Sequence, residues 1–199
     1  RTIIRVDRAE PSKNIVRGFR AFELLLDRYP EFHGRVKFLA FIVPSRTHIR
    51  QYQRYLQEIE DQVKNINVKY GTQDWQPVTV FYENNYTQAI AGMRLYDVLL
   101  VNCVIDGMNL VAKEGPVINT RDGVLILSET AGAHEQLYVG SLSVAPADLE
   151  GTMAAIHRGL TMPAEERAQR VANLTQAIET EDITHWLQRQ LADICALLS

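Results

Sequence analysis

The sequence is poor in cysteine, has no long hydrophobic run and carries no large excess of one charge. Its two cysteines, Cys103 and Cys195, lie far apart and match neither a Cys-x-x-Cys pair nor a metal-ligand motif. A disulfide framework is therefore not expected. A reducing, cytoplasmic setting is favoured, with Cys103 packed as a small apolar residue. No apolar segment is long enough to cross a bilayer and no signal peptide opens the chain, so we predict no membrane association.

The charge balance and the length narrow the class of protein further. A formal net charge of -3 with 23% charged residues argues against a nucleic-acid binder, because such proteins usually carry a basic stripe. The 199 residues are 46% hydrophobic, which suffices for one domain with a sizeable core. The chain opens directly in strand-like sequence without a start methionine, and we interpret it as a fragment of a longer protein.

Basic residues nevertheless gather near the start of the chain. They are Arg1, Arg5, Arg8, Lys13, Arg17 and Arg20. A small anionic partner is one explanation of this cluster. For Arg17 and Arg20 a solvated helix face is an equal alternative.

Short runs of apolar, mostly β-branched residues alternate with helical patterns. The runs lie at residues 2–6, 36–43, 78–82, 98–101, 124–127 and 142–144. Continuous apolar runs are typical of parallel strands that are covered on both faces. Apolar residues at three- to four-residue steps predict helices near residues 15–26, 52–66, 88–96, 110–119 and 153–160 and a last helix at about 182–199. We expect Ser12 and Asp148 to cap the first and the fifth of these helices.

This alternation predicts one compact domain over residues 1–199, a doubly wound α/β fold of the Rossmann-like type with a parallel sheet. In such open sheets ligands bind at the carboxyl ends of the strands. Three loops of this chain lie at such ends and carry polar side chains that a simple connection would not need.

The first loop leaves the first strand and opens the first helix, with Arg8 and Lys13 five residues apart. A helix N-terminus favours an anion through its free N–H groups and its dipole. The planar fork of an arginine and the point charge of a lysine beside it would hold a diphosphate without a glycine-rich loop. The alternative is that Arg8 pairs with Glu10 on the surface.

The second loop follows the fourth strand and reads Asp-Gly-Met-Asn. Asp106 and Asn109 can hydrogen-bond to hydroxyl groups, and the backbone N–H groups of Leu110 and Val111 would point outward from a helix start. Glu114 falls one helical turn further, where a carboxylate could bind the diol of a ribose. The alternative is that Asp106 caps the helix and Glu114 is solvated.

The third loop, residues 128–135, follows the fifth strand and is rich in small residues. Small residues allow a backbone to come close to a ligand or to a neighbouring helix. His134 could act as a base, but a cap or a core hydrogen bond is the more common role of a lone histidine near a helix start. We give catalysis at His134 little weight.

The sequence shows no Ser-His-Asp or Cys-His set, no Walker loop and no metal-ligand cluster. It offers groups that bind a diphosphate and hydroxyls but no nucleophile. That combination favours glycosyl transfer from a nucleotide sugar over hydrolysis.

At these residues the chain resembles the C-terminal half of the trehalose-phosphate synthases, glycosyltransferase family 20. The segment from Asp106 to Glu114 reproduces the most distinctive motif of that family, and the segment from Arg8 to Lys13 resembles its Arg-x-Asp-x-x-Lys element. Further matches follow in the expected order along the whole chain, at residues 44–46, 66–67, 75–77, 127–133 and 162–167.

The resemblance implies a GT-B fold of two Rossmann-like lobes, of which this chain is the C-terminal, donor-binding lobe. The last helix would pack back toward the absent N-terminal lobe. By the family pattern, Arg8 and Lys13 are the catalytic residues, which hold the donor diphosphate and stabilise it as leaving group. The remaining donor contacts implied are Asp106, Gly107, Met108 and Asn109 with the sugar hydroxyls, Leu110 and Val111 with phosphate or ribose through backbone, and Glu114 with the ribose diol.

The family transfers glucose from a nucleoside-diphosphate sugar, of the UDP- or GDP-glucose type, to glucose 6-phosphate with retention and without a metal or other cofactor. Retention without a protein nucleophile implies front-face attack, in which the departing phosphate helps to deprotonate the acceptor. Catalysis then depends on stabilising the leaving group and on positioning. Because the acceptor residues belong to the absent lobe, the fragment alone is expected to be inactive; a homo-oligomer is left open.

The chain departs from the family pattern at three places, which leaves the donor base and the acceptor open. The family usually has Asp where this chain has Glu10 and Lys-Gly where it has Lys13-Asn14. After Glu114 it has Gly115-Pro116, and we expect the proline to interrupt or kink the helix there. These changes resemble the divergent branch that includes validoxylamine-phosphate synthase, a pseudo-glycosyltransferase.

Two alternatives to a trehalose-phosphate synthase follow. Within the same fold, the chain could belong to a pseudo-glycosyltransferase or a glucosylglycerol-phosphate synthase. In another class, it could be a catalytically silent regulatory or interaction domain. The joint presence of Arg8, Lys13, Asp106, Asn109 and Glu114 argues against the silent domain.

Overall fold

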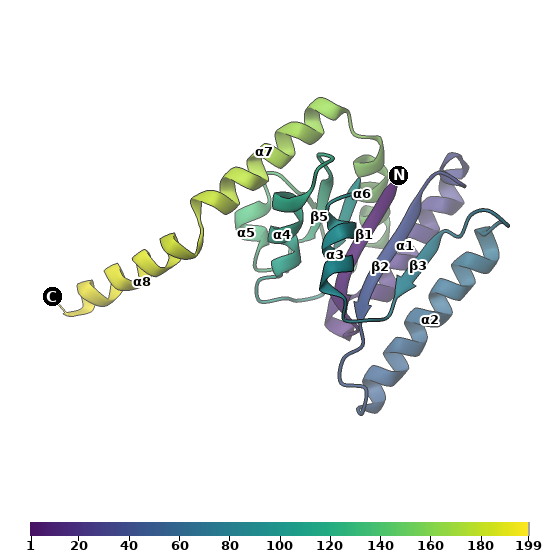
Figure 1. Cartoon of the computed structure of the whole chain (residues 1–199), viewed down its shortest axis with the longest axis horizontal. Coiled ribbons are helices and arrows are strands. Elements are labelled where there is room, and N and C mark those ends of the chain that lie inside the picture. Colours follow the sequence, from purple (N-terminus) through teal and green to yellow (C-terminus); the bar gives the residue numbers. More distant parts are fainter. Residues whose placement is uncertain (199) are drawn as a thin grey trace.

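The structure is a computed structural model that describes residues 1–198. Six parallel strands form one sheet in the order β3-β2-β1-β4-β5-β6 (Figure 1). The strands are β1 (Thr2–Arg8), β2 (Lys37–Val43), β3 (Val78–Phe81), β4 (Val98–Val101), β5 (Val124–Ser128) and β6 (Leu142–Val144). All six predicted strands are present, and the predicted Rossmann-like fold class is confirmed.

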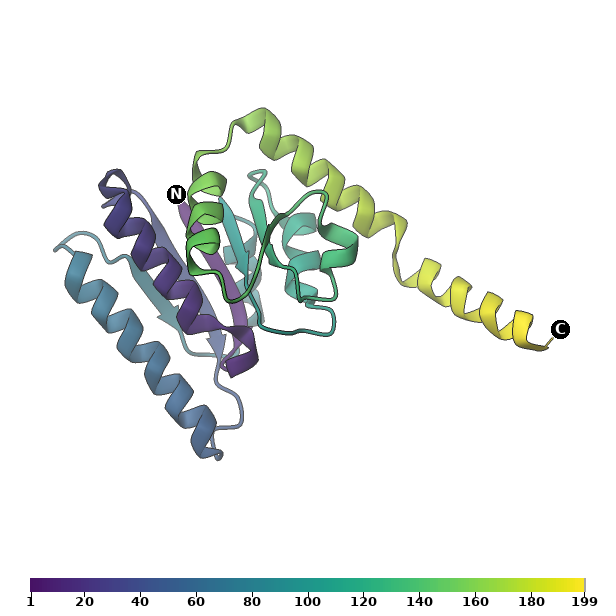
Figure 2. The same cartoon turned by 180° about the vertical axis from the view of Figure 1, so that it is seen from behind.

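Helices cover both faces of the sheet. On one face lie α1 (Ile15–Arg28), α2 (Arg50–Tyr70) and α6 (Leu149–Thr161), and on the other α3 (Tyr86–Met93), α4 (Leu110–Ile118), α5 (His134–Leu137) and α7 (Ala164–Thr180). Figure 2 shows the face that carries α1, α2 and α6. Two short 3-10 helices, η1 (Pro11–Lys13) and η2 (Pro30–Phe32), precede and follow α1.

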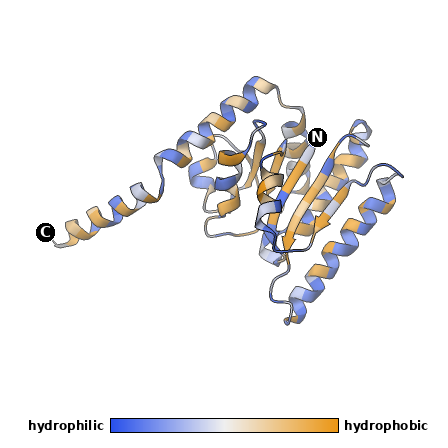
Figure 3. Ribbon diagram, viewed as in Figure 1, coloured by the Kyte–Doolittle hydropathy of each residue, from blue (hydrophilic) through white to orange (hydrophobic). Residues whose placement is uncertain are grey.

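The apolar runs of the strands are explained by the helices that cover both faces of the sheet. Ile3 and Ile4 are both fully buried, Ile3 in the core beneath α1, α2 and α6 and Ile4 in the core on the opposite face. Successive side chains of a strand point to opposite faces, so each face needs its own apolar residues. Figure 3 shows that the strands are mostly apolar, whereas polar and apolar residues alternate along the helices.

One prediction about the helices is wrong, one is wrong in part, and one helix was missed. Ser12 lies within η1 and does not cap α1; Asn14, in the left-handed conformation, precedes the first helical residue instead. The interruption expected at Gly115-Pro116 is absent, because α4 continues through Pro116 to Ile118, and the kink that was its alternative stays a prediction. The sequence pattern also gave no sign of α7, because that helix buries only Arg167 and Leu174 and so shows little apolar periodicity. The predicted cap by Asp148 is confirmed, since its carboxylate accepts from the Gly151 N–H at 2.8 Å.

The packing of α4 against β4 accounts for the glycine of the Gly115-Pro116 pair. A Cβ atom at residue 115 would lie 2.3 Å from the Leu99 side chain, so glycine lets α4 lie close to β4. Pro116 lacks the N–H that would bond to the Ala112 carbonyl one turn back, so α4 forgoes one backbone hydrogen bond there and ends two residues later.

The strand order places the candidate site. β1 and β4 are neighbours at the centre of the sheet, and from there the chain proceeds outward in opposite directions. The loops that leave the carboxyl ends of β1 and β4 therefore lead to opposite faces, α1 on one and α4 on the other, and leave a crevice between them. The first and second predicted loops are these two.

The last helix, α8 (Ile183–Leu198), extends away from the sheet and its covering helices (Figure 1). The prediction of a last helix at about 182–199 agrees with this, except that residue 199 lies outside the described residues. The apolar residues of its stripe, Ile183, Trp186, Leu187, Leu191 and Ile194, are all exposed. Among the described residues, no helix combines the length and the apolar character needed to span a bilayer.

Candidate functional site

A cavity of about 520 Å³ lies at the carboxyl edge of the sheet between the loops that follow β1, β3 and β4. Eight of the nine predicted site residues line it: Arg8, Lys13, Asp106, Met108, Asn109, Leu110, Val111 and Glu114. The structure thus brings the two loops together around one pocket. Gly107 is the exception, because it borders a second groove described below.

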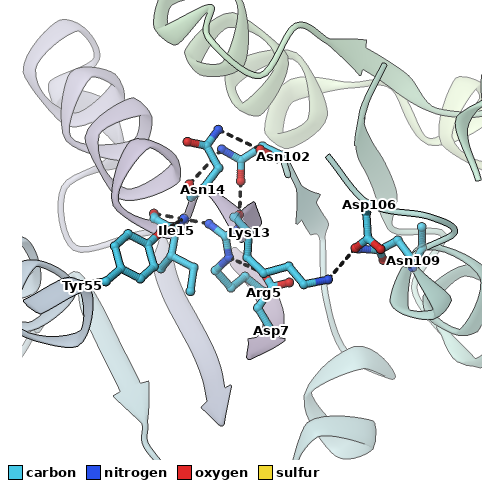
Figure 4. Close-up of polar contacts among 10 residues, drawn as sticks. Arg5, Asp7, Lys13, Asn14, Ile15, Tyr55, Asn102, Asp106 and Asn109 are labelled. Atoms are coloured by element: carbon cyan, nitrogen blue, oxygen red, sulfur yellow. Dashed lines mark hydrogen bonds and ion pairs between the residues drawn. The ribbon is translucent and has the colours of Figure 1, made fainter. Parts of the chain in front are cut away.

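Lys13 and Asp106 connect the two loops directly. The Lys13 ammonium forms an ion pair with Asp106 Oδ2, and Asn109 Nδ2 donates to the same oxygen at 3.0 Å (Figure 4). Both members of the ion pair are largely buried. Burial acts to raise the pKa of Asp106, but the hydrogen bonds and charge of Lys13, with the Asn109 amide, outweigh it and hold that pKa below its usual value.

Asn109, rather than Asp106, caps α4. Its Oδ1 accepts from the Ala112 N–H at 3.0 Å, and its backbone has a positive φ of 75°. Asparagine is among the few non-glycine residues that tolerate a positive φ. The alternative in which Asp106 caps the helix is wrong, and Asp106 is left facing Lys13 at the cavity.

Arg8 lies at the rim of the same cavity. Its guanidinium pairs with Glu10 Oε1 at 2.9 Å, as the surface alternative predicted, and its side chain is 60% exposed. Glu10 itself is nearly buried and also accepts from the Ser45 hydroxyl at 3.0 Å. The pair therefore anchors one side of the rim, with the guanidinium toward solvent and the cavity.

The structure accounts for Asn14, where the family usually has glycine. Asn14 has φ 59°, the left-handed region that favours glycine and next asparagine. Its side chain donates to the carbonyl oxygens of Asn102 and Pro146, each at 2.8 Å. The departure from Lys-Gly therefore keeps the backbone conformation after Lys13 and adds two side-chain hydrogen bonds, one of them buried.

The third predicted loop supports the second. The Gly132 N–H donates to the Asp106 carbonyl at 3.0 Å and the Ala133 N–H to the Met108 carbonyl at 2.9 Å. A Cβ atom at residue 132 would lie 2.0 Å from the carbonyl oxygen of Gly107, so only glycine permits this approach. The small residues of this loop come close to a neighbouring backbone, one of the two roles that the sequence left open.

His134 does not line the cavity. Its Nε2 lies 2.8 Å from the Ser143 hydroxyl, on an exposed part of the surface. Gly107 and Met108 border a broad groove of about 750 Å³ that also receives residues from α5, α7 and α8. Met108 lines both hollows and so separates them.

Sequence reasoning missed a polar group beneath the cavity. Arg5 is fully buried in β1, pairs with Asp7 at 2.8 Å and contacts Asn102 at the end of β4 (Figure 4). Burial raises the pKa of Asp7, although the Arg5 and Lys13 charges act in the opposite direction. The sequence analysis named Arg5 only as a member of the basic cluster, and its position between the apolar Ile4 and Val6 was the signal that could have found this group.

The outer part of the cavity was missed as well. Residues 83–86, between β3 and α3, line it together with Phe41 and Val43 at the end of β2. They lie at carboxyl ends of strands, and that position in the fold was the available signal. Within residues 1–198, no cluster of three or more histidine, cysteine, aspartate or glutamate side chains is placed to hold a metal ion.

The model of glycosyltransferase family 20 matches residues 1–196. The chain belongs to glycosyltransferase family 20. Among curated relatives, the trehalose-6-phosphate synthase of Citrobacter koseri is 38% identical over 197 residues, which cover 96% of this chain and 41% of the relative. The trehalose-6-phosphate synthase of Cronobacter sakazakii is 36% identical, over 98% of this chain. The chain thus spans about two fifths of the length of the curated relatives it matches.

Solved structures of family 20 members superpose closely. A UDP-forming α,α-trehalose-phosphate synthase from Burkholderia xenovorans matches with a TM-score of 0.94 at 36% identity, over all of this chain and 45% of its own. A structure from E. coli bound with UDP-2-fluoro glucose matches with a TM-score of 0.92 at 35% identity, over 97% of this chain and 43% of its own. The chain has the fold of the C-terminal part of these GT-B enzymes.

Proposed function

We propose that the chain is the donor-binding lobe of a retaining, trehalose-phosphate-synthase-like glycosyltransferase. The whole protein would move glucose from a nucleoside-diphosphate sugar to a sugar phosphate. The observation that carries this proposal is the contact between the Lys13 ammonium and the Asp106–Asn109 turn, within one cavity at the crevice between β1 and β4. A cation next to a turn that can bind hydroxyls suits a sugar diphosphate, with the phosphate at the cation and the sugar at the turn.

In this proposal the positive groups at the cavity hold the diphosphate. Lys13 and Arg8 supply charge, and the first N–H groups of α4, those of Leu110 and Val111, supply donors that a helix leaves without intrahelical partners. As the glycosidic bond of the donor breaks, negative charge develops on the departing diphosphate. Groups already fixed in place stabilise that charge without reorganisation, and this is their catalytic contribution.

The two parts of the donor that flank the diphosphate, the sugar and the ribose, would contact carboxylates and amides. Asp106 and Asn109 would accept from and donate to the sugar hydroxyls, with Met108 beside them, and Glu114 would bind the ribose diol from the second turn of α4. Lys13 must then share its charge between Asp106 and the diphosphate. A neutralised Asp106 carboxylate would repel the incoming donor less than a free one.

The names of the relatives support uridine as the donor base. The Burkholderia xenovorans protein is UDP-forming, and the E. coli structure contains UDP-2-fluoro glucose. A second Burkholderia xenovorans structure is in complex with glucose-6-phosphate, which supports a sugar phosphate as acceptor. The buried thiol of Cys103 and the unpaired Cys195 suit the reducing cytoplasm in which we place the protein.

Calorimetry of the chain with UDP, GDP and ADP tests the proposal. We expect heat of binding with UDP, and a marked loss of affinity in Lys13→Ala but not in Lys64→Ala, an exposed lysine on α2. Absence of binding by all three nucleotides would reject the donor-lobe assignment. Product analysis on the whole protein with UDP-glucose and glucose 6-phosphate separates the branches, because trehalose phosphate as product excludes the pseudo-glycosyltransferase and glucosylglycerol-phosphate alternatives.

We further propose that the chain is a single domain whose α8 packs on the N-terminal lobe of the whole protein. Two observations support the N-terminal lobe as the partner of α8. The apolar stripe of α8 is exposed, and more than half of the length of each relative lies outside the part that this chain matches. In the whole protein, Leu191→Asp should then lower thermal stability, whereas in the isolated chain it should not. Concentration-dependent dimers of the isolated chain that Leu191→Asp abolishes would instead indicate a second copy as the occupant, which is the homo-oligomer left open above.

A further inference from the structure

The buried guanidinium of Arg5 lies directly beneath the candidate donor site and joins the two loops that form it. Arg5 projects from β1 toward α1, with no exposed surface. Its Nη2 donates to the Lys13 carbonyl at 2.8 Å and to Asn102 Oδ1 at 2.9 Å. Its Nε donates to Asp7 Oδ2 at 2.8 Å. One side chain therefore holds the backbone of Lys13, the end of β4 and a carboxylate.

The surrounding residues are built for this guanidinium. A Cβ atom at Gly18 would lie 2.4 Å from Arg5 Nη1, so the glycine of α1 leaves the space that the side chain occupies. Asn14 donates to the Asn102 carbonyl at 2.8 Å, and Asn102 donates to the Asn14 carbonyl at 3.4 Å, which ties the same two loops a second time. Such a network restricts where the Lys13 side chain can begin and how far it lies from the Asp106 turn.

Asp7 gives the guanidinium a second role. Its side chain is 7% exposed and lines the cavity near Lys13 and Asp106. A buried carboxylate at that place would repel a diphosphate unless a cation neutralised it. Arg5 is that cation, and it approaches Asp7 from the side away from the cavity.

We infer that Arg5 is a positioning residue of the donor site, which fixes the backbone of Lys13 and neutralises Asp7 so that the cavity accepts a diphosphate. This inference rests on the proposed function. It concerns the diphosphate of the donor only, since the hydrogen bonds of Arg5 reach Asp7, Lys13, Ile15 and Asn102 and not the residues 83–86 that line the outer part of the cavity.

The test compares affinities for UDP and for uridine, measured by calorimetry and by ligand-observed NMR, or for GDP and guanosine should the wild-type chain prefer guanine. Arg5→Met should lower the affinity for the diphosphate about tenfold or more, because it removes a charge-assisted network. It should change the affinity for the nucleoside less than about twofold. The ratio of the two affinities is a readout that general destabilisation does not move.

Arg167→Met is the matched control. Arg167 is also a nearly buried arginine, which donates to the carbonyl oxygens of Arg121 and Asp122 at 2.6 and 2.8 Å, but it does not line the cavity. We expect it to lower stability and to leave the affinity ratio unchanged. Circular dichroism and thermal unfolding establish that each variant is folded before binding is measured.

Two further variants separate the two roles of Arg5. Arg5→Lys keeps the charge but cannot reach all of its partners, so the ratio should fall by a smaller factor, about threefold. Adding Asp7→Asn to Arg5→Met should restore part of the diphosphate affinity, because the repulsive carboxylate is then gone.

An affinity ratio in Arg5→Met within twofold of wild type overturns the inference; if that variant does not fold, an unchanged ratio in Arg5→Lys overturns it. If the double variant recovers none of the diphosphate affinity, the proposed neutralisation of Asp7 by Arg5 is rejected. A wild-type chain that binds no nucleoside diphosphate rejects the proposed function itself, and this outcome is distinct because it is read before any variant is made.

Discussion

The helices α1 and α8 carry the same kind of apolar stripe but meet opposite surroundings. In α1, Ile15, Phe19, Phe22 and Leu26 are fully buried against the sheet. In α8, the stripe of Ile183, Trp186, Leu187, Leu191 and Ile194 is exposed, with Trp186 at 57%. Spacing at three to four residues thus predicts a helix and the face that is apolar, but it does not say whether the partner of that face lies in the same chain.

The difference also shows which apolar surface is buried within this chain and which needs another surface to cover it. α1 begins two residues after Lys13, so the packing of its stripe fixes the first of the two loops that line the cavity. Burying a large apolar side chain stabilises by about 1.5–3 kcal/mol. α1 gains this within the chain, whereas α8 gains it only when another surface covers its stripe.

The largest expected effect compares single truncations in the two stripes. Phe19 packs edge-on against Phe38 at 5.0 Å between ring centroids, without exposed surface. Phe19→Ala should lower the free energy of unfolding of the chain by about 3–5 kcal/mol, because it removes transfer energy and leaves a cavity. Trp186→Ala should change it by about 0.5 kcal/mol or less. Urea unfolding measures both, and similar losses in the two variants would refute the contrast.

The next effect concerns binding. Lys13→Ala should weaken binding of UDP to the chain by about 1.5–3 kcal/mol, roughly ten- to a hundredfold, because a hydrogen-bonded charge is lost at a largely buried site. Arg189→Ala in α8 is the control and should leave the affinity unchanged, although Arg189 borders the larger groove. Calorimetry measures both affinities. If Arg189→Ala weakened binding as much as Lys13→Ala, the nucleotide would be assigned to the larger groove instead of the cavity.

A third change tests how the Asp106–Asn109 turn at the cavity is held. Gly132→Ala places a methyl group against the Gly107 carbonyl, so the backbone must shift and stability should fall by about 1–3 kcal/mol. Gly107→Ala is its counterpart, because a Cβ atom there meets no atom within 4 Å and stability should hold. Thermal unfolding of the two variants decides the point. Equal stability of both would mean that the third loop does not brace the second.

The smallest effect depends on pH. The pKa of Asp106 is held below the usual value of 3.8, so the carboxylate stabilises the fold above that pH and loses the contribution as the pH falls through its lowered value. The stability difference between wild type and Asp106→Asn should stay constant from about pH 7 to pH 5 and shrink below about pH 4. Its size should be about 1 kcal/mol or less, since both side chains of this largely buried pair still border the open cavity, where solvent weakens their attraction. A difference that grows on acidification would show that Asp106 is not stabilised by Lys13 in the folded chain.

Much of the fold could be predicted from the sequence because its strands are buried on both faces. Short runs that are mostly apolar mark all six strands, and the alternation with helices gives the parallel sheet. The place of the site followed from the fold, since loops after neighbouring strands meet at one edge. α7 could not be predicted in this way, because it contacts the body through few residues and has no clear stripe.

The contacts within the site could not be predicted, because they depend on tertiary structure. Nothing local distinguishes Asp106 from Asn109 as the cap of α4; the left-handed backbone of Asn109 and the reach of Lys13 decide it. The role of Gly132 depends on a carbonyl 25 positions earlier in the chain. Arg5 was visible as a charge in an apolar strand, but its partners lie in three separate segments.

A crystal structure of the chain with UDP-glucose tests the central claim most directly. We predict the diphosphate between the Lys13 ammonium and the first N–H groups of α4, with the glucose hydroxyls at Asp106 and Asn109. A nucleotide sugar bound instead in the groove between α5, α7 and α8, with the Lys13–Asp106 pair undisturbed, would contradict it.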